Sequence, residues 1–129
     1  MRGGVIHERS LDLLDFRFAS LGAKTGRQVP VSLGRSTGYI DLVVEMENIL
    51  LAIEAERSRR RVEGDVIKAQ TVGAAELWIV TPQQMLVRRI RDTLGDVRPG
   101  NQNQVAVSVL TLGDALQQVP NCFSRFLPS

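Results

Sequence analysis

Acidic side chains recur at regular positions in two neighbouring apolar runs, residues 39–46 and 49–56. The short gap between the runs contains Asn48, and asparagine tolerates the left-handed backbone that a tight hairpin turn requires. A two-residue turn predicts antiparallel strands in which Asp41 faces Glu54. Directly opposed residues in such strands have Cβ atoms about 4.5–5.5 Å apart. The sequence therefore predicts two carboxyl groups side by side.

This pairing assigns the side chains of the hairpin to two faces. One face is wholly apolar and must be core: Ile40, Leu42, Val44, Met46, Ile49, Leu51, Ile53 and Ala55. The other face carries the acids Asp41, Glu45, Glu54 and Glu56, together with Tyr39, Val43, Leu50 and Ala52. A shift of the register by one residue would move acids into the core, so the alternation supports this pairing.

The acidic face has two interpretations that the spacing leaves open. Two opposed carboxylates repel one another, and Glu56 on the same face increases the repulsion. Either the group lies in open water, or a divalent cation lies between the oxygens. Mg²⁺ prefers oxygen ligands and often takes one or two carboxylates together with water and substrate phosphate. The apolar neighbours Val43, Leu50 and Ala52 favour a partly covered cleft.

Further elements are predicted around the hairpin by hydrophobic periodicity and capping residues. We expect a mixed α/β sheet flanked by helices, in the order helix, three strands, helix, strand, helix, strand and short helix. The inner face of the first helix is predicted from Leu11, Leu14, Phe18 and Leu21, with Leu13 and Phe16 widening the stripe. Outside the hairpin, the predicted elements are helix 5–21, strand 28–33 with Pro30 at an edge, helix 58–73, strand 76–80, a helix capped by Thr81, strand 105–110 and a short helix opened by Thr111 and closed by Pro120.

Length and composition exclude several classes of protein. The 129 residues fit one domain over 1–129, and 43% hydrophobic with 23% charged residues excludes a disordered or collagen-like chain. One cysteine, Cys122, and one histidine, His7, exclude a disulfide framework and a zinc site built from both residue types. The absence of a signal-peptide pattern and of a long apolar run predicts a cytoplasmic protein without a membrane partner. No glycine-rich phosphate loop is present, which argues against a nucleotide cofactor.

The hairpin resembles the PD-(D/E)XK, or restriction-endonuclease-like, superfamily of nucleases. The matching segments are Gly38-Tyr39-Ile40-Asp41-Leu42-Val43-Val44 and Ala52-Ile53-Glu54-Ala55-Glu56. The predicted helix, three strands, helix and strand over about residues 5–81 follow the family's αβββαβ core. The resemblance implies a restriction-endonuclease-like domain to which a helix, a strand and a short helix are added at the C-terminal side.

The resemblance also implies a metal site and a reaction. Asp41 and Glu54 would be the metal-binding acids, the Ala55 carbonyl a third ligand, and Glu8 an additional acid on the first helix. The ion would be Mg²⁺ or Mn²⁺, and it would lower the pKa of a bound water and stabilise charge on a scissile phosphate.

One position departs from the family pattern, because Glu56 stands where the family usually carries lysine. Some members carry glutamate there and remain active, and others have moved the lysine to the following helix. On that helix Lys68 and Gln70 are within reach of the site. The resemblance thus implies that Glu56 is a further ligand or a general base and that Lys68 stabilises the phosphate.

A cluster of arginines, Arg57, Arg59, Arg60 and Arg61, directly follows the hairpin. Cations at the start of a helix are unfavourable, and a phosphate backbone would offset that cost. The alternative is a solvated face on which these arginines pair with nearby glutamates. By contrast, Arg88, Arg89 and Arg91 of the later helix are interpreted as ordinary surface.

Two functions are compatible with these features. The first is a metal-dependent DNA endonuclease or resolvase-like phosphodiesterase, which at this size is expected to act as a homodimer on duplex DNA. The second is a catalytically inactive module with the same fold that binds DNA or a protein partner. The absence of lysine at position 56 favours the second.

Overall fold

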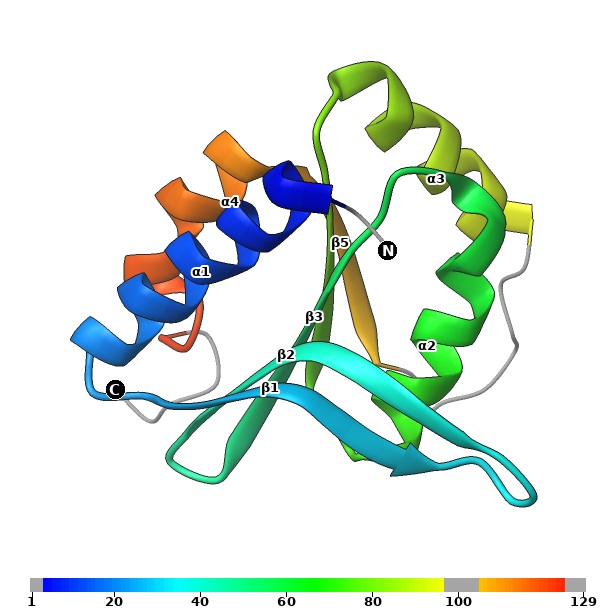
Figure 1. Cartoon of the computed structure of the whole chain (residues 1–129). Coiled ribbons are helices and arrows are strands. Elements are labelled where there is room, and N and C mark those ends of the chain that lie inside the picture. Colours follow the sequence, from blue (N-terminus) through cyan, green and yellow to red (C-terminus); the bar gives the residue numbers. More distant parts are fainter. Residues whose placement is uncertain (1–3, 97–104, 125–129) are drawn as a thin grey trace.

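The computed structural model describes residues 4–96 and 105–124 of the chain (Figure 1). Its first part contains α1 (Gly4–Ser20), β1 (Lys24–Ser32), β2 (Thr37–Met46), β3 (Ile49–Ala55), the 3-10 turn η1 (Arg59–Arg61) and α2 (Val62–Thr71). Its second part contains β4 (Glu76–Thr81), α3 (Gln84–Asp96), β5 (Ala106–Thr111), α4 (Leu112–Gln118) and the 3-10 turn η2 (Val119–Asn121). None of the helices in the described ranges is long and apolar enough to cross a membrane.

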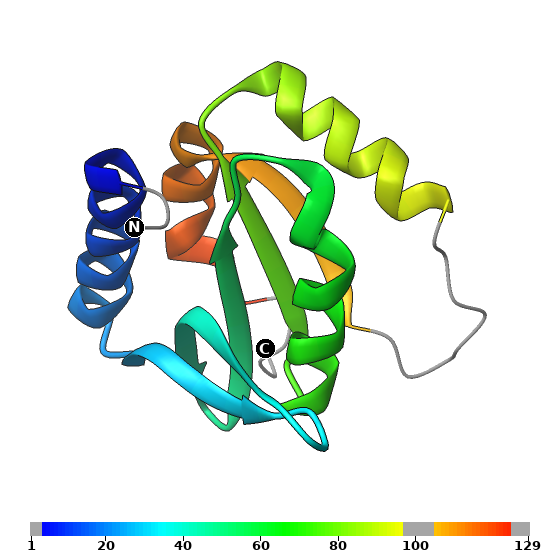
Figure 2. The ribbon, with the colours of Figure 1, turned by 45° about the vertical axis from the view of Figure 1, so that its right-hand side comes forward.

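The five strands form one mixed sheet in the order β1-β2-β3-β4-β5. The first three strands are antiparallel neighbours, whereas β3, β4 and β5 run parallel. Helices α1 and α4 lie on one face of the sheet, and α2 and α3 lie on the other (Figures 1 and 2). The predicted mixed α/β sheet flanked by helices is thereby confirmed, and β1 lies at the edge where Pro30 was expected.

The hairpin has the predicted register. Met46 pairs with Ile49 at the turn, and Leu42 pairs with Ile53 at the other end of the ladder. The two turn residues, Glu47 and Asn48, have φ angles of 53° and 67°. Two successive left-handed residues match the twist of the flanking strands, which is why such turns connect hairpins.

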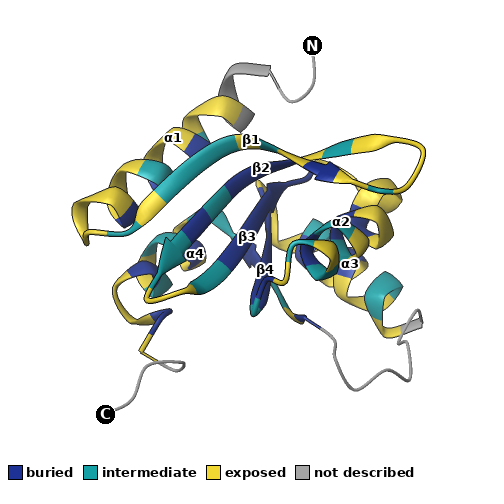
Figure 3. Cartoon of the chain, turned by 90° about the horizontal axis from the view of Figure 1, so that it is seen from below, coloured by how far each residue is buried: buried dark blue, intermediate teal, exposed yellow. Residues whose placement is uncertain are grey.

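Two apolar cores cover the two faces of the sheet, and β4 contributes to both because its side chains alternate. Trp78 packs with Phe18 of α1 on one face, with ring centroids 5.7 Å apart. Leu77 and Ile79 pack on the other face, beneath α2 and α3. The central strands are therefore buried on both sides (Figure 3).

Several expectations about single residues were wrong. Ile40 packs in the core beneath α2 and not with Leu42, and the pairing of β1 with β2 skips the Asp41 position between these two residues. Leu13, Phe16 and Leu21 are exposed, since only a narrow stripe of α1 contacts the sheet. Strand β1 begins at Lys24 rather than at residue 28.

The helix boundaries differ slightly from the prediction. The segment after the hairpin opens as η1, with the Ser58 hydroxyl accepting a hydrogen bond from the Arg60 amide. Thr81 is the last residue of β4, and its hydroxyl accepts from the Gln83 amide just before α3. Thr111 caps α4 as expected by accepting from the Asp114 amide. The helix expected after Thr81 is α3, which ends at Asp96.

Candidate functional site

Asp41 and Glu54 lie together just beyond the last paired residues of the hairpin. Both are buried, with 8% and 2% of their surfaces exposed. Oε1 of Glu54 accepts a hydrogen bond from the main-chain amide of Asp41 at 3.1 Å. Oδ2 of Asp41 accepts one from the amide of Ala55, the next residue of β3, at 2.9 Å. Each carboxylate thus binds the backbone of the opposite strand, which fixes the two groups beside one another.

Gln28 explains why the strands open at this point. Its φ angle is 49°, in the left-handed region that non-glycine residues rarely adopt. The pairing of β1 with β2 continues on both sides of Gln28 but skips the Gln28–Asp41 position. The Gln28 side chain instead donates from Nε2 to Oδ1 of Asp41 at 3.3 Å. A local break in the edge strand therefore lets the Asp41 amide turn to Glu54, and the sequence prediction missed it.

The main chain of Ala55 faces the same site. In an antiparallel pair a residue directs its N–H and its C=O to the same neighbouring strand. Because the Ala55 amide donates to Asp41, its carbonyl oxygen lies on the Asp41 side of β3 as well. This placement agrees with the expected use of that carbonyl as a ligand.

Lys68 of α2 reaches the two acids from above the sheet. Its Nζ lies 2.6 Å from Oε2 of Glu54 and donates to the main-chain oxygen of Tyr39 at 2.7 Å. A Cβ atom at Gly38 would lie 3.0 Å from Cδ of Lys68, so the absence of a side chain there makes room for the lysine stem. Lys68 is therefore held over the site by contacts with both strands.

Asp65 is a further member of the site that the sequence prediction missed. It lies one helical turn before Lys68, is 2% exposed, and has Oδ1 at 3.5 Å from Lys68 Nζ. Its Oδ2 is buried and has no hydrogen-bond donor among the described residues. The available signal was its spacing, since Val62, Asp65 and Ala69 share the inner face of α2.

The electrostatics of the site follow from burial and from an excess of acids. Burial, with the negative charge of Asp65, raises the pKa of Glu54 to about 8, although Lys68 acts in the opposite direction. Burial, with the neighbouring Glu56, raises the pKa of Asp65 to about 9. Burial lowers the pKa of Lys68, but its hydrogen bond with Glu54 and the negative charges of Glu54, Asp65 and Asp41 together outweigh this, and the net shift is upward. Glu54 and Asp65 thus both pair with the ammonium group of Lys68, and the carboxyl groups of Asp41 and Glu56 are buried beside them.

The residues present fit a divalent cation. Within residues 4–96 and 105–124, no three His, Cys, Asp or Glu side chains form a ready-made metal-binding group. Mg²⁺, however, commonly takes only one or two protein carboxylates and completes its shell with water and phosphate. Asp41, Glu54 and the Ala55 carbonyl offer such a partial shell, and the pairing of both Glu54 and Asp65 with Lys68 favours a further positive ion there.

The other residues of the expected site are distributed as follows. Glu56 is 7% exposed at the end of β3 and close to Asp65. Glu8 is exposed on α1 and pairs with Arg27 of β1 at 3.0 Å. Gln70 lies on the opposite side of α2 from Lys68, where it lines a cavity of about 860 Å³ with residues of α3 and β5. The structure thus brings Lys68 to the two acids and directs Gln70 elsewhere.

The arginines that follow the hairpin are all exposed. Arg57 comes directly after Glu56, and Arg59, Arg60 and Arg61 form η1 at the start of α2. They therefore border the acidic site without being buried in it. Close to them lies Arg89 of α3, which the sequence analysis interpreted as ordinary surface.

Comparisons with known proteins bear on the fold alone. No family model matches the chain, and no curated protein matches it. A solved structure, described as the crystal structure of a protein of unknown function, AF1548, is similar to it with a TM-score of 0.57 and 13% sequence identity. The similarity covers 90% of this chain and 67% of the other chain.

Proposed function

We propose that this chain is a metal-dependent DNA endonuclease or resolvase-like phosphodiesterase in which Asp41 and Glu54 hold Mg²⁺ or Mn²⁺. The observation that carries the proposal is the arrangement of the two buried carboxylates, each bonded to the opposite strand and facing Lys68. A structural ion pair alone would need one acid for one lysine. Here Lys68 pairs with two acids, Glu54 and Asp65, which favours a site that is completed by a cation.

The chain's own residues divide the work of phosphodiester hydrolysis. A divalent ion, when bound, would supply positive charge to the scissile phosphate and a more acidic water. Lys68, positioned by Tyr39 and Glu54, would donate a hydrogen bond to a phosphate oxygen and stabilise its developing charge. Glu56, at the end of β3 beside the acids, would accept the proton of the attacking water.

A second candidate function is an inactive module that binds DNA or a protein partner. The observation in its favour is that Lys68 already lies at ion-pair distance from Glu54 Oε2, one of the oxygens that a metal ion would use. In such a module Lys68 would replace the metal and hold the two strands together permanently.

Nicking of supercoiled plasmid DNA tests the proposal. Wild-type protein is expected to nick the plasmid in Mg²⁺ or Mn²⁺ but not in EDTA, and Asp41→Asn and Glu54→Gln are expected to lose at least about 100-fold of that activity. Glu45→Gln is the matched control, because Glu45 lies on β2 but is half-buried further along the strand. DNA binding without cleavage in either metal would contradict the endonuclease and support the module.

A further inference from the structure

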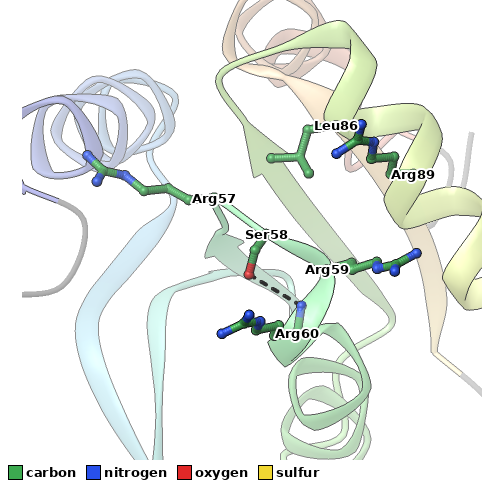
Figure 4. Close-up of a pocket in the computed structure, with 6 residues that line it drawn as sticks. All are labelled: Arg57, Ser58, Arg59, Arg60, Leu86 and Arg89. Atoms are coloured by element: carbon green, nitrogen blue, oxygen red, sulfur yellow. Dashed lines mark hydrogen bonds between the residues drawn. The ribbon is translucent and has the colours of Figure 1, made fainter.

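A cavity of about 430 Å³ lies between η1 and the start of α3, next to the acidic site. It is lined by Arg57, Ser58, Arg59, Arg60, Leu86 and Arg89. Figure 4 shows the side chains of Arg59 and Arg89 extending into the space between the end of the hairpin and α3, whereas Arg57 points towards α1 and Arg60 points away from α3. Tertiary packing thus brings an arginine of α3 to arginines that are about thirty residues earlier in the chain.

The cavity gathers arginines from η1 and α3 within the described part of the chain. None of the ion pairs there involves Arg59, Arg60 or Arg89. Guanidinium groups gathered without carboxylates repel one another, and a phosphate group relieves that repulsion with paired hydrogen bonds. The cavity therefore fits an anion with several oxygens.

Leu86 indicates which anion fits. It is half-buried and supplies an apolar wall among the arginines. Inorganic phosphate has no apolar part to place there, whereas the sugar of a nucleic-acid backbone has one. The location agrees with this, because Arg57 and Ser58 of the cavity wall follow Glu56 directly in the chain.

We propose that Arg89, with Arg59, binds the phosphodiester backbone of DNA a few nucleotides from the scissile phosphate. The proposal deepens the proposed function and rests on it for the position of the scissile phosphate. It adds α3 to the DNA-binding surface, so that the backbone is held between two elements. Binding by this cavity is independent of the metal ion.

The test is DNA binding in EDTA, where no cleavage interferes. Affinity for a duplex is measured by fluorescence anisotropy at several salt concentrations for wild type, Arg89→Ala and Arg88→Ala. Arg88 is the matched control, because it is exposed on the same helix and carries the same charge but does not line the cavity. We expect Arg89→Ala to weaken binding about tenfold and to reduce the salt slope by about one, and Arg88→Ala to change affinity less than about twofold.

Two results would overturn the proposal. Equal losses for both variants would show that only overall charge matters, and an Arg89-dependent affinity for inorganic phosphate as tight as that for the duplex would assign the cavity to a small anion. Failure of this proposal can be distinguished from failure of the proposed function. If Asp41→Asn keeps Arg89-dependent binding and even wild type does not cleave, the endonuclease fails and the backbone site remains.

Discussion

Nζ of Lys68 lies 2.6 Å from Oε2 of Glu54, and both groups are largely buried. The lysine belongs to α2 and the glutamate to β3, so this contact joins the helix to the centre of the sheet. It lowers the pKa of Glu54 but does not outweigh burial and the nearby Asp65, and the pKa remains raised at about 8. Lys68 therefore compensates only part of the cost of burying the ionised Glu54, and a further positive charge would stabilise that ionised form.

Removal of this lysine is expected to destabilise the fold. Lys68→Met leaves the buried carboxyl groups without a cation, and breaking a buried pair in this way costs about 3 kcal/mol. Lys24→Met is the control, since Lys24 is exposed, and it is expected to change stability by less than about 0.5 kcal/mol. Urea unfolding at pH 8.5 measures both, and the cost of Lys68→Met should shrink in the Glu54→Gln background. Equal effects of the two lysine variants would contradict the role assigned to Lys68.

The metal-free protein is expected to lose stability as pH rises. Glu54 and Asp65 have pKa values raised to about 8 and about 9 in the folded state, so the folded protein binds more protons than the unfolded chain above pH of about 4. Stability therefore falls between about pH 5 and pH 9. In EDTA we expect a Tm at least about 5 °C lower at pH 9 than at pH 6. Asp65→Asn should flatten this dependence, and a Tm that rises with pH would contradict it.

The left-handed conformation of Gln28 is expected to matter more than its amide. Gln28→Gly keeps the backbone angle and loses the bond to Asp41, whereas Gln28→Val favours an extended strand that draws the Asp41 amide back to β1. Affinity for Mn²⁺, measured by calorimetry, should fall about threefold in the glycine variant and at least about thirtyfold in the valine variant. A valine variant that binds Mn²⁺ like wild type would show that the break in β1 is incidental.

The hairpin turn offers a stabilising change outside the site. Glu47 and Asn48 both have positive φ, and the pair that this turn prefers is Asn-Gly. The double variant Glu47→Asn, Asn48→Gly should raise the free energy of unfolding by about 1 kcal/mol, which corresponds to a Tm increase of a few degrees. Its Mn²⁺ affinity should stay unchanged. A lower Tm would be inconsistent with the turn that the structure shows.

The sequence was sufficient for the hairpin and for the meeting of Asp41 with Glu54. Strand periodicity allows only one register that keeps acids out of the core, and Asn48 places the turn that sets it. Each residue in the ladder from Leu42 to Met46 pairs as this reasoning required. The hairpin register could be predicted from the local sequence because the residues in contact are close together in the chain.

Features that depend on tertiary packing could not be predicted from the sequence. Asp65 interrupts an apolar helix face, and nothing in the helical period shows that Lys68 lies 3.5 Å from its carboxyl group. Glutamine is not a residue type that typically adopts a left-handed backbone, so the positive φ of Gln28 could not be predicted from its identity. Arg89 joins the arginines of η1 only because α3 packs beside that turn. Each of these depends on contacts between segments that are far apart in the chain.

The most direct test of the proposed metal site is a crystal of the wild-type protein soaked in Mn²⁺ and measured at the manganese absorption edge. We expect an anomalous peak between Asp41 and Glu54, with carboxylate oxygens about 2.1 Å from the ion, and no such peak in Asp41→Asn. An empty site at saturating Mn²⁺, with Lys68 still paired to Glu54, would contradict the metal-dependent nuclease.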